Sequence, residues 1–516
     1  MENMHVVNQT KKKIWFFSFL ALIAYLLINT GIVSDDFTYT VVLKNKSFIK
    51  MLLFEVKCFT TPFENFTHFI WYPLFRLDNF IVAEILKIFY IALSFYFVTK
   101  FFSLYLNQIN AYIASFLFLF FPSHDSTTYW FLGQYLTLSM AFYLYAYYLA
   151  YRNRFWGALL MALAASFVSY GSPVIALSLF LVFLLDKKLK KGLVLLIPNV
   201  IYSVYYVFLT QVLKTGTNRI PLEINIPVIA RQFILQIVTF TDSMIGPSMW
   251  LKIYYSFSQL TITSLIIGVL LVVVFYKTYE KRTEKYNRNL VLGLTALTGL
   301  SFAMFAVTGF YPQLAFNLGN RVTIFGSLLL TYLIVLMPLS RKWKTALFAL
   351  IIFSILGISD HWKEWNTEQQ RVIETIKNNQ SLKNYKDKRI VYVAGNQYSK
   401  YGPISHIEFF SENMAVDPLL NFLTENSVKT AEPINKRHKY EDGYLVDTKY
   451  KWKKKVDRYI VVYDSDNNTL FRVAAGEINK FIDSLPAEKR HWVQIIKNDR
   501  VRGLILKLMP RLEYAL

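Results

Sequence analysis

Two adjacent carboxylates, Asp35 and Asp36, follow the first long apolar stretch of the chain. Acidic side chains are costly where a helix leaves a membrane unless they are solvated, paired or functional. A carboxylate at this position can act as a general base, a metal ligand or a charge stabiliser. An acidic residue also suits a helix start, where it accepts hydrogen bonds from free amide groups. The pair therefore predicts either a catalytic site or the cap of a helix over 37–57.

A second polar group lies in a short turn further along the chain. His124 and Asp125 stand there directly before Ser126 and Thr127. Imidazole and carboxylate groups are common metal ligands, and either group can orient or activate a hydroxyl. The structural alternative is a helix start capped by Ser126 or Thr127. We take His124 and Asp125 as candidate substrate-binding residues.

Three arginines are candidates for binding an anionic group. Arg321 begins an apolar segment, where its forked guanidinium and a helix N-terminus would both suit phosphate oxygens. The alternative for Arg321 is a side chain that extends to lipid headgroups. Arg76 ends the aromatic run 68–76, which also suits an anchor at a membrane interface, and Arg219 lies in the long segment 211–257.

Composition indicates a polytopic membrane protein. Of 516 residues, 54% are hydrophobic and only 17% are charged, which excludes a disordered, fibrous or single-core soluble chain. The single cysteine, Cys58, excludes an internal disulfide. The net charge of +22 comes largely from clusters beside apolar segments, so we expect membrane lipids and no nucleic acid as partners.

Apolar segments predict about eleven transmembrane helices. They are 14–33, 80–99, 109–121, 129–151, 155–170, 173–185, 192–210, 258–276, 289–309, 322–338 and 343–358. With this count and a cytoplasmic N-terminus, every Lys and Arg cluster falls on the cytoplasmic side. The long loops 34–79 and 211–257 then lie outside, with interfacial helices expected over 37–57 and 228–240.

The chain is predicted to have two parts, a membrane module over 1–358 and an extracytoplasmic tail over 359–516. Strand patterns occur at 389–395 and 459–464, and 469–474 is the expected hairpin partner of the second. Residues 476–485 and 490–496 have helical spacing. The tail is therefore predicted to be a small α/β domain. It carries no phosphate-binding loop, zinc spacing or serine nucleophile elbow.

These features together resemble the GT-C superfamily of integral-membrane glycosyltransferases. The resemblance rests on Asp35-Asp36 after the first span, a long first outer loop, many spans and an outward C-terminal domain. It covers most of 1–358 and identifies no particular family. Members use lipid-phosphate-linked sugars and place a first-loop Asp near the acceptor. The resemblance therefore implies that Asp35 or Asp36 is the general base or helps to bind a metal.

The implied reaction moves a sugar from a polyprenyl-phosphate donor to a glycan or lipid acceptor on the outer face. Attack opposite the phosphate leaving group would invert the anomeric centre. Arg321, with Arg76 or Arg219, would stabilise the departing phosphate. No cofactor is required by the sequence. A divalent cation such as Mg²⁺ or Mn²⁺ stays open, and its ligands would come from the acidic pair and from His124-Asp125.

Three other functions remain open. A polysaccharide polymerase or ligase would share the lipid-linked substrate but need not use Asp35 and Asp36. A transporter or flippase of lipid-linked glycans predicts charged or broken helices at mid-membrane. If the protein is instead a structural assembly protein whose tail binds a partner, replacing Asp35 or Asp36 by Asn should cause no loss of activity. The composition suits a multi-pass protein of a bacterial plasma membrane.

Overall fold

The computed structural model describes residues 2–44, 46–47, 49, 60–215, 225–279, 286–309, 311–496 and 498–508. The chain divides into two compact units. The first comprises Met1–Ile28, Ser47–Trp71 and Ala83–His361, and the second comprises Asn29–Lys46, Tyr72–Val82 and Trp362–Leu516. The second unit thus joins the predicted tail to two parts of the predicted first outer loop.

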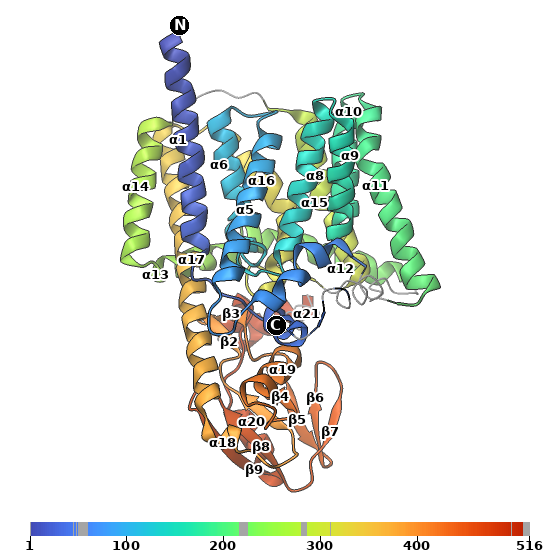
Figure 1. Ribbon diagram of the computed structural model, residues 1–516, viewed down its shortest axis with the longest axis vertical. Helices are drawn as coiled ribbons and strands as arrows, with labels where there is room; N and C mark the ends of the chain where they lie inside the picture. Colours follow the sequence, from blue (N-terminus) through green and yellow to red (C-terminus); the bar gives the residue numbers. More distant parts are fainter. Residues whose placement is uncertain are drawn as a thin grey trace. The chain divides into compact units, whose positions relative to one another are not determined.

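The first unit is a bundle of helices (Figure 1). Its helices are α1 (Glu2–Leu27), α4 (Phe63–Thr67), α5 (Ile81–Phe102), α6 (Gln108–Leu119), α7 (Ser126–Tyr129), α8 (Gln134–Tyr151), α9 (Phe155–Val168), α10 (Ser172–Leu185), α11 (Leu189–Val207), α12 (Ile226–Met244), α13 (Pro247–Ser258), α14 (Ile262–Thr278), α15 (Arg288–Thr308), α16 (Ile324–Leu336) and the first part of α17 (Arg341–Asn378). Short 3₁₀ or π turns are η1 (Phe69–Leu74), η2 (Pro122–His124), η3 (Phe208–Val212) and η4 (Leu318–Thr323).

Six helical segments among the described residues are long and apolar enough to cross a membrane. They are Ile81–Phe102, Leu189–Val212, Ile226–Ser258, Arg288–Thr308, Leu318–Leu336 and Arg341–Asn378. Five apolar helices are shorter: Lys13–Leu27, Gln108–Leu119, Phe155–Val168, Ser172–Leu185 and Ile262–Lys277. These apolar helices indicate that the chain is a membrane protein. All eleven predicted segments overlap helices, but only six helical segments meet the length and composition of a span.

Local sequence explains several helix ends in this unit. The side-chain oxygens of Asn107 and Asn287 accept hydrogen bonds from the first amides of α6 and α15. The predicted break between two short helices is confirmed, because α9 ends at Val168 and α10 begins at Ser172. Pro173 occupies the first turn of α10, where its missing N–H has no cost.

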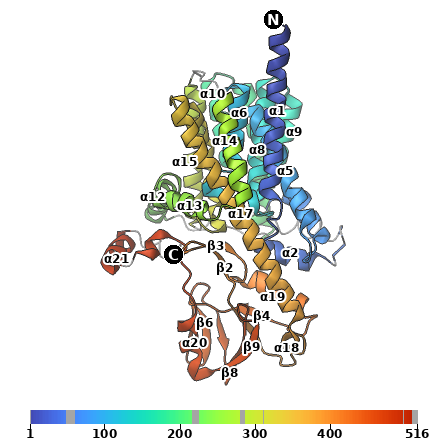
Figure 2. The same ribbon diagram turned by 90° about the vertical axis from the view of Figure 1, so that its left-hand side faces the viewer.

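Helix α12 has its polar face inside and its apolar face outside. Gln232, Gln236 and Thr239 are buried, whereas Ile226 and Ile234 are exposed. A soluble protein would place these side chains the other way round, so the outward face suits contact with lipid. Both α12 and α13 lie across one end of the bundle (Figures 1 and 2). The predicted helix over 228–240 is thus present, and it is longer than predicted.

The second unit contains a four-stranded sheet of order β4-β1-β8-β9. The strands are β1 (Val391–Ala394), β4 (Ala431–Pro433), β8 (Tyr459–Asp464) and β9 (Thr469–Ala474). Strand β1 pairs in parallel with β4 and β8, whereas β8 and β9 form an antiparallel hairpin. The predicted strands and hairpin are therefore confirmed. The apolar core beneath the sheet includes Tyr392, Leu445, Ile460, Val462, Ile478 and Ile482.

Two smaller sheets and several helices complete this unit. One is the hairpin of β2 (Tyr398–Tyr401) and β3 (Ile404–Glu408), and the other is a sheet of β5 (His438–Glu441), β6 (Tyr444–Asp447) and β7 (Lys453–Lys455). The helices are α2 (Asp35–Leu43), the end of α17, α18 (Gln380–Lys383), α19 (Asn413–Leu423), α20 (Ile478–Ser484) and α21 (Asp499–Leu508). The predicted helix over 490–496 is only a 3₁₀ turn, Trp492–Ile495.

Candidate functional site

The predicted acidic pair begins helix α2 of the second unit. Asp36 is fully buried, and its carboxylate accepts hydrogen bonds from the Tyr72 hydroxyl at 2.7 Å and the Val33 amide at 3.2 Å. Burial, together with the Asp36 charge, raises the pKa of Tyr72. The Asp35 side chain is only half-buried. Asp36 therefore holds the chain that enters α2, and Asp35 is the more accessible carboxylate.

The tail residues of the second unit hold α2 in place. The Phe37 and Phe409 ring centroids are 5.2 Å apart, and the Thr38 hydroxyl donates to the Met414 carbonyl of α19. Helices α2 and α19 pack together. The remainder of the predicted helix over 37–57 lies largely outside the described residues. The acidic pair is thus positioned by residues far away in sequence, which the sequence alone did not indicate.

Asp125 lies in a buried charged cluster of the first unit. Lys252 Nζ donates to Asp125 Oδ1 at 2.7 Å and to the Ala315 carbonyl at 2.6 Å. The side chains of Lys252 and Asp125 are 0% and 2% exposed. The Asn320 amide also donates to Asp125 Oδ1 and accepts a hydrogen bond from Ser126 Oγ. Asp125 therefore joins α13 to the two turns that carry residues 122–129 and 315–321.

His124 is buried and turned toward aromatic rings. Its Nδ1 lies 2.8 Å from the Thr127 hydroxyl, and its ring stacks on Phe121 with centroids 6.1 Å apart. Its Nε2 is buried and has no hydrogen-bond partner among the described residues. The predicted His124-Asp125 turn is thus a compact, buried element held by hydrogen bonds among its own residues.

Arg321 follows Asn320 and lies between aromatic rings. Its guanidinium carbon is 5.1 Å from the Trp130 ring centroid and 5.2 Å from that of Tyr311. Within the described part of the chain, no carboxylate lies within ion-pair distance, and the buried Nε atom has no acceptor. A cation with aromatic neighbours and no counter-ion is suited to receive an anion.

The two other predicted arginines are Arg76 and Arg219. Arg76 belongs to the second unit, where it forms a bidentate pair with Asp78 at 2.8 and 3.1 Å. Their side chains are 72% and 60% exposed, which is the arrangement of a surface ion pair. Arg219 lies outside the described residues.

The sequence did not predict Lys252 as a site residue. A lysine in an apolar segment was the available signal, but 211–257 was interpreted as an outer loop in which a lysine has no special meaning. Because Asp125 and Lys252 are far apart in sequence, only the fold reveals that they form a pair.

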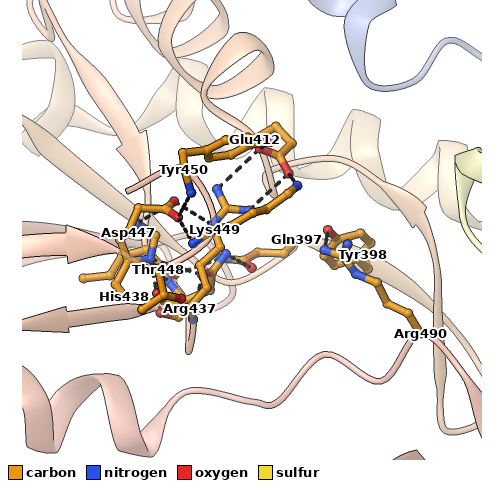
Figure 3. A network of polar contacts seen from close by, with 12 residues as sticks. Gln397, Tyr398, Glu412, Arg437, His438, Asp447, Thr448, Lys449, Tyr450 and Arg490 are labelled. Carbon is orange, nitrogen blue, oxygen red and sulfur yellow. Dashed lines mark hydrogen bonds and ion pairs between the residues drawn. The ribbon is translucent and has the colours of Figure 1, made fainter. Parts of the chain in front are cut away.

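A second polar network, absent from the sequence predictions, connects α19 with β5 and β6 (Figure 3). Glu412 accepts hydrogen bonds from Arg437 at 3.1 Å, Lys449 at 2.9 Å and Tyr450 at 2.9 Å. Burial acts to raise the pKa of Glu412, but the two cations outweigh it and the pKa is lowered. Burial also lowers the pKa of His438 to about 4. The members of this network satisfy one another and leave little capacity for a ligand.

The candidate residues do not form a metal-binding group in the structure. In the described ranges, no group of three or more His, Cys, Asp or Glu side chains is arranged to hold a metal ion. The acidic pair belongs to the second unit, whereas His124 and Asp125 belong to the first. Comparison with known proteins finds no family model that matches the chain and no curated protein that is similar to it in sequence.

Proposed function

We propose that the protein is a membrane glycosyltransferase that moves a sugar from a polyprenyl-phosphate donor to an envelope glycan or lipid acceptor. The observation that carries the proposal is Arg321, a cation beside two aromatic rings and without a carboxylate partner among the described residues. A lipid phosphate supplies the missing negative charge. Its apolar tail suits a helical unit whose outward side chains are apolar.

The donor phosphate would be bound and stabilised by the Arg321 guanidinium. As the bond between the anomeric carbon and the phosphate oxygen breaks, negative charge grows on the departing phosphate. Charge-assisted hydrogen bonds from a preorganised guanidinium stabilise that charge more than they stabilise the bound donor. Asn320 precedes Arg321 and donates to Asp125, so the cluster with Lys252 fixes the backbone that presents the guanidinium.

Asp35 is the better candidate for the general base. It would take the proton from an acceptor hydroxyl while that oxygen attacks the anomeric carbon opposite the leaving phosphate. Its side chain is half-buried, whereas the buried Asp36 carboxylate already accepts two hydrogen bonds. In this proposal Asp36 and Tyr72 position α2, and the configuration at the anomeric carbon is inverted.

The test is sugar transfer in membranes that contain the full chain. Radiolabelled polyprenyl-phosphate sugars would be supplied to wild type, Asp35→Asn, Asp36→Asn and Arg321→Ala at matched expression, with Arg76→Gln as a surface control. We expect wild type and Arg76→Gln to consume one lipid sugar and Asp35→Asn to consume almost none. Equal transfer by all variants would refute the assigned roles.

One observation favours a transporter or flippase as the second candidate. The apolar segment 226–258 is broken between α12 and α13, and it carries Lys252, which forms a buried pair with Asp125. Broken helices and buried charges are typical of transport sites. Reconstituted liposomes with fluorescent lipid-linked glycans separate the candidates. A flippase moves the intact lipid between leaflets, whereas a transferase releases polyprenyl phosphate.

A further inference from the structure

The β2–β3 hairpin of the second unit carries a carboxylate, Glu408, to which no described residue donates a hydrogen bond. Glu408 ends β3 and lies opposite Tyr398 in the register of the hairpin. It is half-buried, and within the described residues no donor or cation lies within bonding distance of its carboxylate. Burial raises the pKa of Glu408. Glu408 therefore bears the cost of partial desolvation, which the charges of Arg490 and Lys449, beyond ion-pair distance, offset in part.

Arg490 lies beside the same hairpin. The Ser405 amide donates to the Lys489 carbonyl at 2.6 Å, which holds the segment 488–490 against β3. The Arg490 guanidinium donates to the Tyr398 hydroxyl and lies 4.7 Å from the ring centroid of Tyr398. Figure 3 shows Arg490 beside Tyr398 and apart from the network around Glu412. In the described ranges, no carboxylate is within ion-pair distance of Arg490.

This pair of groups adjoins the candidate base within one compact unit. Phe409 follows Glu408 and contacts Phe37, which follows the acidic pair. Glu408 interacts electrostatically with both Asp35 and Arg490. The Glu408 carboxylate and the Arg490 guanidinium therefore lie in the electrostatic surroundings of the Asp35 carboxylate.

We propose that Glu408 and Arg490 form a subsite that binds the hydroxyl groups of a sugar acceptor beside Asp35. The proposal rests on the proposed function. The carboxylate accepts hydrogen bonds from two neighbouring hydroxyls, and the guanidinium donates to a ring or hydroxyl oxygen. The subsite binds and orients the acceptor and forms no covalent bond.

Charge decides between a neutral and an anionic ligand. Arg490 supplies one positive charge, and Asp35 and Glu408 supply up to two negative charges. The nearby Glu412 is already neutralised by Arg437 and Lys449. An added phosphate or carboxylate group would meet carboxylates that repel it, whereas neutral hydroxyls can serve both kinds of group. The acceptor is therefore a neutral sugar at the position that this subsite binds.

The experiment uses the full chain in lipid nanodiscs and an array of immobilised neutral and anionic oligosaccharides. Glu408→Gln keeps the side-chain shape and removes the charge, and Arg490→Gln removes the cation. Glu441→Gln is the control for the first, because Glu441 is an exposed residue paired with Lys439. Arg472→Gln is the control for the second, because Arg472 lies 4.7 Å from the Tyr459 ring centroid in the same unit.

We expect wild type and both controls to bind at least one neutral glycan. Glu408→Gln and Arg490→Gln should weaken that binding by about tenfold or more, because each removes hydrogen bonds to a charged group. Glu408→Gln should not unfold below the wild-type temperature, because no hydrogen bond is lost and the charge that is removed is partly desolvated. Binding of anionic glycans alone, binding of none, or unchanged affinity in Glu408→Gln would each overturn the proposal.

Donor consumption, measured on the same samples, separates the two proposals. If wild type consumes a lipid sugar and Glu408→Gln has an unchanged KM for its acceptor, the subsite is wrong and the transferase stands. If glycan binding is lost in Glu408→Gln while wild type consumes no lipid sugar, the transferase is wrong and the glycan site stands. Loss of both binding and acceptor use in Glu408→Gln supports both.

Discussion

Replacing Lys252 by methionine should destabilise the first unit strongly. The side chains of Lys252 and Asp125 are 0% and 2% exposed, so removal of the cation leaves a buried carboxylate. Lys252 also donates to the Ala315 carbonyl at 2.6 Å, and that hydrogen bond is lost too. Breaking one partner of a buried ion pair costs about 3–5 kcal/mol.

The double change Lys252→Met with Asp125→Asn should be milder than the single change. It leaves no buried charge, and Asn320 keeps a side-chain oxygen to which it can donate. Replacing both partners of a buried pair costs far less than removing one. We therefore expect the double variant to lose about 1–2 kcal/mol of unfolding free energy, and the coupling energy between the two positions to be at least about 2 kcal/mol.

The assay is thermal unfolding of the purified full chain in one detergent, followed by intrinsic fluorescence. The expected order of Tm is wild type, then the double variant, then Lys252→Met. Lys188→Met is the matched control, because Lys188 pairs with Asp186 at 3.4 Å with 37% of its side chain exposed. That control should change stability by about 0.5 kcal/mol or less. A Tm for Lys252→Met equal to that of the control would refute the reasoning.

Three further predictions concern other parts of the chain. Arg76→Gln should leave lipid-sugar consumption within about twofold of wild type, because exposed ion pairs contribute little; a loss like that of Arg321→Ala would contradict the surface assignment. His438 has its pKa lowered to about 4, so the stability it contributes is present above pH 6.5 and is lost as pH falls toward 4. His438→Gln should remove about 2 kcal/mol of the pH dependence between pH 7 and pH 4.5, which is measured as Tm at these two pH values. A Cβ on Gly357 would lie 1.9 Å from the Ser256 carbonyl, so Gly357→Ala should lower Tm, whereas Gly299→Ala, which meets no atom within 4 Å, should not.

Much of the helical unit could be predicted because its signals are local. Apolar runs of sufficient length and the Gly171–Pro173 break depend on neighbouring residues alone, and both are present as helices and a turn. The helix predicted over 228–240 is also present, as α12, but its ends and the following helix α13 were not predicted. Gln232 and Gln236 are buried in α12, and the contacts that bury them are not visible in the sequence.

The candidate site was only partly predictable. Asp35 and Arg321 were identified from their places next to apolar segments, but their surroundings depend on contacts between distant residues. Lys252 and Asp125, for example, are 127 residues apart in the sequence. In the tail, β7 consists of Lys453–Lys455, whose pattern resembles a solvated charged loop rather than a strand. Strands of three or four residues carry too few alternating positions to be recognised.

The most direct test of the central claim is release of polyprenyl phosphate by the purified full chain in nanodiscs. Mass spectrometry would follow the lipid sugar and free polyprenyl phosphate together, for wild type, Asp35→Asn and Arg321→Ala. We predict that wild type converts one lipid sugar to polyprenyl phosphate and a glycosylated acceptor, and that both variants lose at least about 99% of this activity, the magnitude expected for removal of a general base or a charge-stabilising group. Full conversion by Arg321→Ala and Asp35→Asn would contradict the account.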